Sequence, residues 1–227
     1  MAVRNSLIFR SVFGDAEMMT RIRPVLAGQM ALLDHVKDGV SYINRVWGTG
    51  NAYGYPANAS SLFSVSNPGA PYGTAGQPLS WYIWAISGAP YLSMDSNPSD
   101  AAGVISALNS YYQNRVKGWF DAYDSYAAQN GVKVACYEGG LEITATPATV
   151  AAQTLPAMRD LLVDYLEYFF SKPTSDKFMY YALATNWNVE LYGLNNSTAS
   201  ETTAAPPAAG QRSYKWDAVK QVIADGH

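Results

Sequence analysis

The sequence of 227 residues predicts an α/β protein built on a parallel sheet. Segments suited to strands alternate four times with segments whose apolar residues recur at helical spacing. In the segment 132–140, Val and Ala occupy both faces, as in a strand that helices cover on both sides. Polar residues follow the apolar runs, and parallel α/β folds form their sites at that end of the strands. Together these observations favour right-handed βαβ units.

Four segments are expected to contain the strands, namely 21–29, 80–92, 132–140 and 176–188. The first is short and ends in a polar residue, whereas the second is strongly apolar and aromatic. The segments between and after them, 30–48, 97–131, about 155–169 and 214–226, are expected to be helical because their apolar residues lie three or four apart.

The helical segments carry their own start and stop signals. Ser99 or Asp100 can cap the second helix, and Gly48 and Gly131 are placed to end the first two. The expected buried stripes are Leu33, Val36, Val40, Ile43 and Trp47; Ile105, Leu108, Tyr112, Val116, Trp119 and Tyr123; Leu155, Met158, Leu162, Tyr165 and Phe169; and Trp216, Val219, Val222 and Ile223.

The whole chain, 1–227, is expected to form one (β/α) domain with two long loops. The segment from about 48 to 80 is rich in Gly, Pro, Asn and Ser, and the segment 195–212 is rich in Ala, Thr, Pro and Ser. Tyrosines in the first loop are candidates for a ligand role, with packing inside the loop as the alternative.

The composition argues against several classes of protein. Hydrophobic residues make up 48% and charged residues 15%, so a sizeable core is available. The net charge is only -3 and no Lys/Arg cluster occurs, so no nucleic-acid partner is expected. No run approaches about 20 apolar residues, which predicts no membrane span. The start, "MAVRNSLIFRSVFG", has no signal-peptide pattern.

No metal or cofactor is expected either. The two histidines, His35 and His227, provide no metal-ligand spacing, and no phosphate loop or dinucleotide motif is present. A Ser–His triad is improbable because the sequence has no nucleophile elbow. Cys136 lies inside an apolar run, where a packed, inert thiol is expected.

The stretch "VACYEGG" ends an apolar strand on a carboxylate, Glu138, which Gly139 and Gly140 follow at once. Gln29, Tyr91 and Asn186 likewise come just after apolar runs. Because the carboxyl ends of parallel strands meet at one edge, we expect these four side chains to share a face. The two glycines would let another backbone or a ligand approach Glu138 closely.

The segment "VKVACYEGG" resembles the seventh-strand motif of TIM-barrel glycoside hydrolases of the retaining clan. In order, "RIRPVLAGQ", "WAISGAPYL" and "FMYYALATNWN" are similar to the fifth, sixth and eighth strands, and "YKWDAVKQV" to the closing helix. The opening "NSLIFRSVFGDAEMMTRIRPV" resembles the helix before the fifth strand. The resemblance implies the carboxyl half of a barrel, without the strand-four Asn-Glu pair that supplies the family's acid/base. Members of the family are mostly secreted bacterial proteins.

The resemblance implies a hydrolase of oligosaccharide or polysaccharide with Glu138 as the nucleophile. Tyr137 would hydrogen-bond to Glu138, and Gln29, Tyr91, Asn186 and Trp187 would bind substrate. Retaining hydrolysis needs a second carboxyl group about 5 Å away, for which Glu142, Asp95 and Glu190 are candidates. Trp84 could stack on sugar but is more typical of core. The alternative is a non-catalytic remnant that binds carbohydrate or only folds.

A half-barrel would leave its inner face and two sheet edges uncovered. Inner residues are expected to include Val25, Ile86, Val134 and Tyr181. We therefore expect a homodimer, in which a second copy covers this face and brings a second Glu138 to the same mouth. Folding of the 48–80 loop over the face is the alternative.

Overall fold

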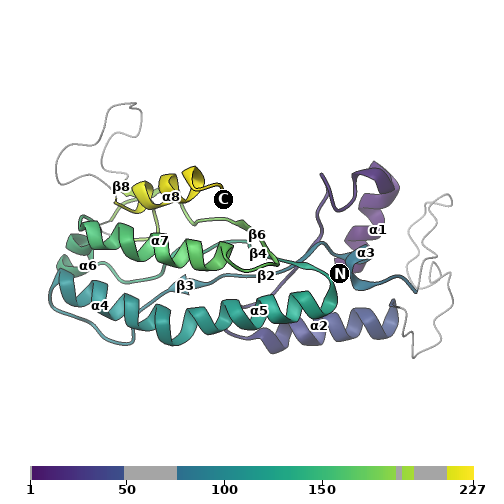
Figure 1. Cartoon of the computed structure of the whole chain (residues 1–227), viewed down its shortest axis with the longest axis horizontal. Coiled ribbons are helices and arrows are strands. Elements are labelled where there is room, and N and C mark those ends of the chain that lie inside the picture. Colours follow the sequence, from purple (N-terminus) through teal and green to yellow (C-terminus); the bar gives the residue numbers. More distant parts are fainter. Residues whose placement is uncertain (1, 49–75, 188–190, 197–213) are drawn as a thin grey trace. The chain divides into compact units, whose positions relative to one another are not determined.

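The computed structural model describes residues 2–48, 76–187, 191–196 and 214–227 (Figure 1). The protein is α/β, with a parallel four-stranded sheet in the order β1-β2-β4-β6. Its strands are β1 (Val25–Ala27), β2 (Ala85–Gly88), β4 (Lys133–Cys136) and β6 (Ser175–Phe178). This confirms the predicted α/β class with a parallel sheet, since each of the four expected segments contributes one strand to it.

The chain divides into two compact units. Unit 1 comprises residues 1–88 and 122–135, and unit 2 comprises residues 89–121 and 136–227. Whether the two units fold as the single domain expected from the sequence stays a prediction. Of the two predicted loops, 49–75 and 197–212 lie outside the described residues.

Unit 1 places short strands against helix α2. Its helices are α1 (Ala2–Phe13), the 3-10 turn η1 (Asp15–Glu17), α2 (Leu33–Val46), α3 (Leu79–Tyr82) and the second half of α5 (Lys117–Asn130). Strands β1 and β2 pair with Leu26 opposite Ile86. Leu26 packs against Gly39 of α2, and Val36, Val40, Ile43 and Val46 form the buried stripe of this helix.

The segment predicted as one strand, 80–92, is divided in three. It begins as helix α3, continues as β2, and resumes after a break as β3 (Tyr91–Leu92). Pro78 precedes the helix with φ −65°, an angle suited to starting a helical turn. Arg10 of α1 then stacks over Trp81 of α3 at 3.6 Å, which holds this turn in place.

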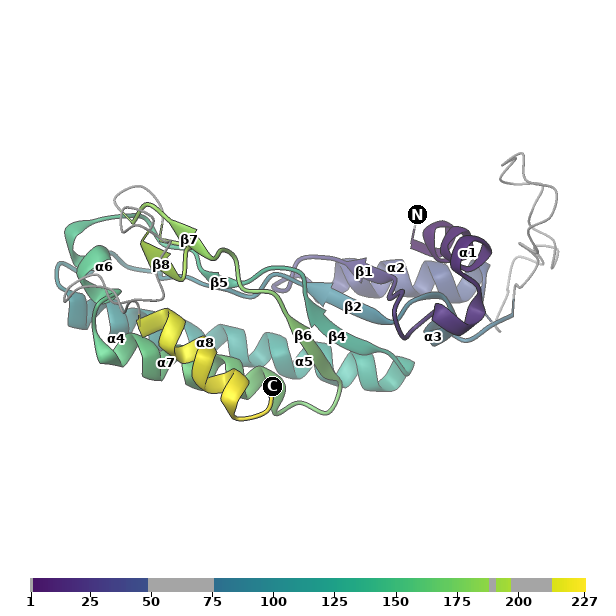
Figure 2. The ribbon, with the colours of Figure 1, turned by 90° about the horizontal axis from the view of Figure 1, so that it is seen from above.

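Unit 2 is built on a set of helices and several very short strands. The helices are α4 (Ala101–Tyr111), the π-helical turn η3 (Tyr112–Val116), the start of α5, α6 (Pro147–Ala152), α7 (Pro156–Phe170) and α8 (Tyr214–Ala224). The further strands are β5 (Gly140–Leu141), β7 (Ala184–Thr185) and β8 (Asn195–Asn196). Figure 2 shows α4, α7 and α8 on one side of β5, β7 and β8.

The predicted helix over 97–131 is confirmed as a run of helical turns from Ala101 to Asn130. Of the two candidate caps, Asp100 is the one that acts, because its side chain accepts from the Gly103 N–H at 2.8 Å. Gly131 follows with φ +65°, the left-handed conformation that ends helices.

Helix α7 carries the aromatic core of unit 2, which consists of Tyr112, Phe120, Tyr165, Phe169 and Phe178. Tyr165 lies 5.5 Å from Phe178, 5.6 Å from Phe120 and 5.9 Å from Tyr112, measured between ring centroids. Phe169 lies 5.4 Å from Phe178 and 5.3 Å from Phe120. Most of these pairs meet edge to face, the arrangement that aromatic quadrupoles favour.

Two of the four residues expected on an open inner face are buried instead. Val25 and Tyr181 are 37% and 47% exposed, as expected, but Ile86 and Val134 are 0% and 2% exposed. Ile86 is the register partner of Leu26, so both side chains lie on the face that α2 covers. The prediction was wrong for Ile86 and Val134.

Helix α8 packs on α7 and buries an unexpected residue, Lys215. The helix buries Lys215, Ala218 and Val222, while Trp216 and Ile223, predicted on its apolar stripe, are 37% and 62% exposed. The Lys215 ammonium donates to the Leu191 carbonyl at 2.8 Å. Burial lowers the pKa of Lys215 to about 7, because a charged amine is costly to hold away from water.

Lys215 should make stability depend on pH. Below pH 7 both the folded and the unfolded chain hold its proton, and the folded state bears the full cost of burying the charge. Between about pH 7 and 10.5 the unfolded chain holds more protons, so the free energy of unfolding rises with pH. We expect Lys215→Met to stabilise the protein relative to wild type more at pH 6 than at pH 9, measured by urea unfolding.

Lys220→Met is the matched control, because Lys220 lies on the same helix with 56% of its side chain exposed. This variant should differ from wild type by the same small amount at both pH values. A Lys215→Met effect that does not change between pH 6 and pH 9 would contradict the assignment.

Candidate functional site

Three chain segments lie side by side in unit 2 and bring Glu138 between two tyrosines. Strands β3 and β5 pair in parallel with Tyr91 opposite Gly140, and the Glu142 N–H donates to the Leu92 carbonyl at 2.8 Å. On the other side, the Tyr181 N–H donates to the Gly139 carbonyl at 2.8 Å. Glu138 therefore lies in the middle segment, with Tyr91 and Tyr181 on its flanks.

Glu138 and Tyr91 interact directly. Glu138 is partly exposed just after β4, and the Tyr91 hydroxyl hydrogen-bonds to its carboxylate. Burial raises the pKa of Tyr91 most, and Glu138 raises it further, because a negative carboxylate opposes a second negative charge. Glu142 acts on the pKa of Tyr91 in the same direction. Two carboxylates thus face one phenol that stays protonated.

Tyr137 lies beside Glu138 at the surface. Its side chain is 39% exposed, and its pKa is raised by burial first and by the neighbouring Glu138 second. The Tyr91 hydroxyl hydrogen-bonds to Glu138, and the hydrogen bond predicted from Tyr137 stays a prediction. The ladder register brings Tyr91 close, because β3 lies beside the strand that follows Glu138.

A tyrosine cluster, made of Tyr91, Tyr181 and Tyr192, extends this surface. The ring centroids of Tyr91 and Tyr192 lie 5.9 Å apart, and those of Tyr181 and Tyr192 lie 5.6 Å apart. Tyr192 was missed in the sequence because it belongs to no predicted strand or helix, so no periodicity marks it. The repeated tyrosines in "YYALATNWNVELYG" are the one local sign of such a cluster.

The segment 178–183 presents alternate residues to solvent. Met179, Tyr181 and Leu183 are 53%, 47% and 63% exposed. Phe178 points the other way, into the aromatic core. This period of two is that of an extended chain with one covered and one open face. The open face of unit 2, defined as Tyr91, Glu138 and the alternate residues 179, 181 and 183, is therefore partly apolar.

The double glycine has a structural reason that differs from the predicted one. A Cβ at Gly139 would lie 2.6 Å from the Phe178 ring, and a Cβ at Gly140 would lie 2.6 Å from the Tyr180 ring. Gly140 also has φ +122°, a conformation that L side chains rarely adopt. The close neighbours are thus aromatic rings of the protein itself.

The other predicted binding residues differ in their surroundings. Gln29 lies in unit 1 after β1, where it is exposed and its carbonyl accepts from the Tyr123 hydroxyl at 3.0 Å. Asn186 is exposed just after β7. Trp187 is 2% exposed, and its indole N–H donates to the Gly193 carbonyl at 3.2 Å. A ring so buried has no free face for stacking on a sugar.

The candidate second acids differ in their surroundings. Asp95 is ion-paired with Arg115 at 2.9 Å, whereas Glu142 is exposed next to the Tyr91–Glu138 pair. Glu190 lies outside the described residues. Trp84 in unit 1 is half-buried beneath Arg23, whose guanidinium lies 4.8 Å from the ring centroid.

Two further features of the described part of the chain are its metal-ligating side chains and its cysteine. No group of three or more His, Cys, Asp or Glu residues there could hold a metal ion. Cys136 is fully buried, as predicted, and burial raises the pKa of its thiol, which keeps it unreactive. Within the described ranges, no helix is both long and apolar enough to cross a membrane.

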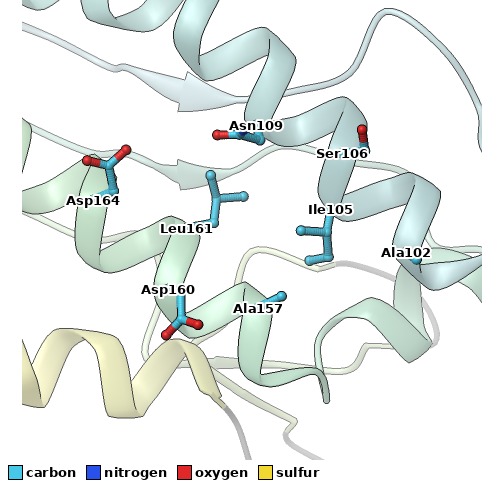
Figure 3. Close-up of a pocket in the computed structure, with 8 residues that line it drawn as sticks. All are labelled: Ala102, Ile105, Ser106, Asn109, Ala157, Asp160, Leu161 and Asp164. Atoms are coloured by element: carbon cyan, nitrogen blue, oxygen red, sulfur yellow. The ribbon is translucent and has the colours of Figure 1, made fainter.

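A separate groove of about 380 Å³ lies between α4 and α7 (Figure 3). Ile105 and Leu161 contribute its apolar lining, and Asp160 and Asp164 its charges. Both acids already have partners, since Asp160 pairs with Arg159 at 2.7 Å and Asp164 lies 3.8 Å from the Lys117 ammonium. The groove therefore offers less chemistry than the face around Glu138.

The face around Glu138 combines carboxylates, a protonated phenol and half-exposed aromatic rings. Comparison with known proteins finds no matching family model, no matching curated protein and no matching solved structure. Function is therefore inferred from the residues and their geometry.

Substitution of Gly139 and Gly140 tests how tightly the rings of Phe178 and Tyr180 pack against this segment. We expect Gly139→Ala and Gly140→Ala each to lower the free energy of unfolding by about 1–3 kcal/mol, because the added methyl group would overlap an aromatic ring. Gly140→Ala should cost more because of its positive φ. Chemical denaturation measures both.

Gly118→Ala serves as the control, since Gly118 lies in α5 with no atom within 4 Å of the added methyl group. It should stabilise the helix by up to about 1 kcal/mol. Equal effects of the three substitutions would show that the rings move aside freely.

Proposed function

We propose that this protein is a glycoside hydrolase-like (β/α) protein that acts on oligosaccharide or polysaccharide, with Glu138 as the nucleophile. The observation that supports this most is the contact between Tyr91 and Glu138 on the open face of unit 2. The resemblance of "VKVACYEGG" to a glycosidase strand points to the same residue. In this proposal the chain corresponds to the carboxyl half of a barrel.

Glu138 would attack the anomeric carbon and form a covalent glycosyl intermediate, which water then hydrolyses. The carboxylate suits this role because it is partly exposed and lies at the end of a strand. The Tyr91 hydroxyl would hold one carboxylate oxygen and leave the other free to attack. Because the pKa of Tyr91 is raised, the phenol remains a donor throughout the usual pH range.

The reaction also needs an acid that protonates the leaving oxygen. Glu142 is our candidate, since it follows Glu138 by four residues and also raises the pKa of Tyr91. Four residues of extended chain span about 13 Å between Cα atoms. The two side chains would therefore have to lean toward each other to reach the separation of about 5–5.5 Å that a retaining mechanism uses.

The tyrosine cluster would bind the sugar. Tyrosine rings present an apolar face to the C–H side of a pyranose and a hydroxyl to its polar edge. Tyr181 is half-exposed, and Tyr192 lies between it and Tyr91. A chain of sugars could therefore lie across the cluster toward Glu138.

A second candidate function is carbohydrate binding without hydrolysis. It is favoured by the lack of a second free acid in the case of Asp95, which is ion-paired with Arg115. The aromatic surface would then bind glycan, and Glu138 would only orient Tyr91.

Replacement of Glu138 separates these functions. The exchange Glu138→Gln keeps the shape and removes the charge of the nucleophile, so hydrolysis of aryl glycosides and polysaccharides should fall by about two orders of magnitude or more. The melting temperature and polysaccharide binding should change little. Glu17→Gln, a surface exchange in unit 1, is the control and should leave hydrolysis unchanged.

Binding without hydrolysis in the wild type would support the second function. If the wild type neither hydrolyses nor binds any glycan in the panel, both functions are wrong. Full activity of Glu138→Gln would exclude Glu138 as the nucleophile.

We also propose that the protein forms a homodimer through the open face of unit 2. Met179, Tyr181 and Leu183 are about half-exposed or more and lie on one face of an extended segment. Contiguous apolar patches larger than a few hundred Å² are rare on soluble monomers, and a second copy would cover these side chains. A twofold axis through this face would bring two copies of Glu138 together, and like charges raise the pKa of one carboxyl group in such pairs.

Light scattering at micromolar concentration tests the dimer. We expect a mass of twice the 24.6 kDa of one chain. Leu183→Ser should shift the population to the monomer because it removes an exposed apolar side chain from the contact. Val12→Ser, at a 66% exposed position on α1, is the control and should leave the dimer intact. A stable species of 24.6 kDa for the wild type would contradict the proposal.

A further inference from the structure

Tyr165 is a buried tyrosine of α7 whose hydroxyl reaches the strand ends beneath the site. The side chain is 0% exposed and lies at the centre of the aromatic core. Its hydroxyl donates to the Pro90 carbonyl at 2.5 Å. The Gly140 N–H hydrogen-bonds to the same oxygen. This oxygen also lies 3.3 Å from the position that a Cβ at Gly139 would occupy. One hydroxyl thus contacts the segments that carry Tyr91 and Glu138.

The Tyr165 hydroxyl lies at the end of the ladder between β3 and β5. The Glu142 N–H donates to the Leu92 carbonyl, which is one rung of the parallel β3–β5 ladder. Two residues earlier on each strand, the same register faces the Gly140 N–H toward the Pro90 carbonyl. The Tyr165 hydroxyl contacts both of these groups. It therefore lies beside the rung at which Pro90 and Gly140 face each other.

We propose that Tyr165 is a positioning residue, whose hydroxyl sets the spacing between the strand ends that carry Tyr91 and Glu138. Pro90 directly precedes Tyr91, and Gly140 lies two residues after Glu138, so a change of this spacing moves the phenol relative to the carboxylate. The consequence for glycan chemistry rests on the proposed function, whereas the effect on the strand ends does not.

The ring and the hydroxyl of Tyr165 have separable roles. The ring packs edge to face on Phe178 and on Tyr112, which anchors α7 to β6 and to η3. A phenylalanine would keep these contacts and remove only the oxygen. The Pro90 carbonyl would then lose the hydroxyl donor and keep only the Gly140 N–H that the ladder register places opposite it, so the separation of the two strand ends could change. Burial raises the pKa of Tyr165, so the hydroxyl remains a donor at any working pH.

The test compares Tyr165→Phe with Tyr112→Phe. Both tyrosines are fully buried in the same aromatic core, and the Tyr112 hydroxyl also donates to a backbone carbonyl, that of Asp164, at 2.9 Å. The two exchanges therefore remove the same group and one similar hydrogen bond. Tyr112 differs in that its hydroxyl contacts α7 rather than the strand ends.

The readout is local and needs no substrate. In Tyr165→Phe, we expect the amide NMR signals of Tyr91, Glu138 and Gly140 to shift, and hydrogen exchange at Gly140 to change about tenfold or more relative to Tyr112→Phe. Tyr112→Phe should leave these signals in place, even where its melting temperature falls equally. If the protein hydrolyses glycosides, Tyr165→Phe should lower kcat more than Tyr112→Phe does.

Equal signals at the strand ends in the two variants would overturn the proposal. If Tyr165→Phe does not fold, wild-type hydrogen exchange decides: the Gly140 amide should exchange slowly because it contacts a buried oxygen, and fast exchange would overturn the proposal. Unchanged glycan chemistry with shifted strand-end signals would contradict the proposed function and leave the positioning role intact.

Discussion

The close contact between the Gly139–Gly140 turn and the aromatic core supports the rest of unit 2. Phe178 and Tyr180 lie where any side chain at the two glycines would have to go. The chain can therefore pass directly over these rings and place Glu138 next to Tyr91. Dispersion contacts of this kind are individually small, but they are lost steeply when atoms move apart or overlap. The position of the site depends on this fit.

The two faces of unit 2 consequently have different chemistry. The helix-covered face is filled with aromatic rings, with Tyr165 as their centre. The open face carries Glu138, Glu142 and the tyrosine cluster, so polar and aromatic groups meet at one surface. Half-exposed tyrosines beside carboxylates are well suited to sugars, which have apolar C–H faces and polar edges.

Part of the candidate site could be predicted because parallel strands bring their carboxyl ends to one edge. Tyr91 and Glu138 both follow apolar strands, and they do interact. Tyr192 and Tyr165 could not be predicted as their neighbours, since one lies outside any periodic segment and the other belongs to a helix stripe that indicates only burial. Trp187 shows the opposite error, because a strand-end aromatic can turn either to solvent or into the core.

The sequence by itself determined the α/β class, the four segments that contain the sheet strands, and the ends of the long helix, with Ser99 or Asp100 at its start and Gly131 at its end. These features depend on local periodicity and on backbone preferences of single residues, which are present in the sequence. Only the tertiary structure decided what lies against the double glycine, which residues α8 buries, and which hydroxyl donates to the Pro90 carbonyl. Those outcomes depend on side chains far apart in sequence, whose contacts are settled when the elements pack.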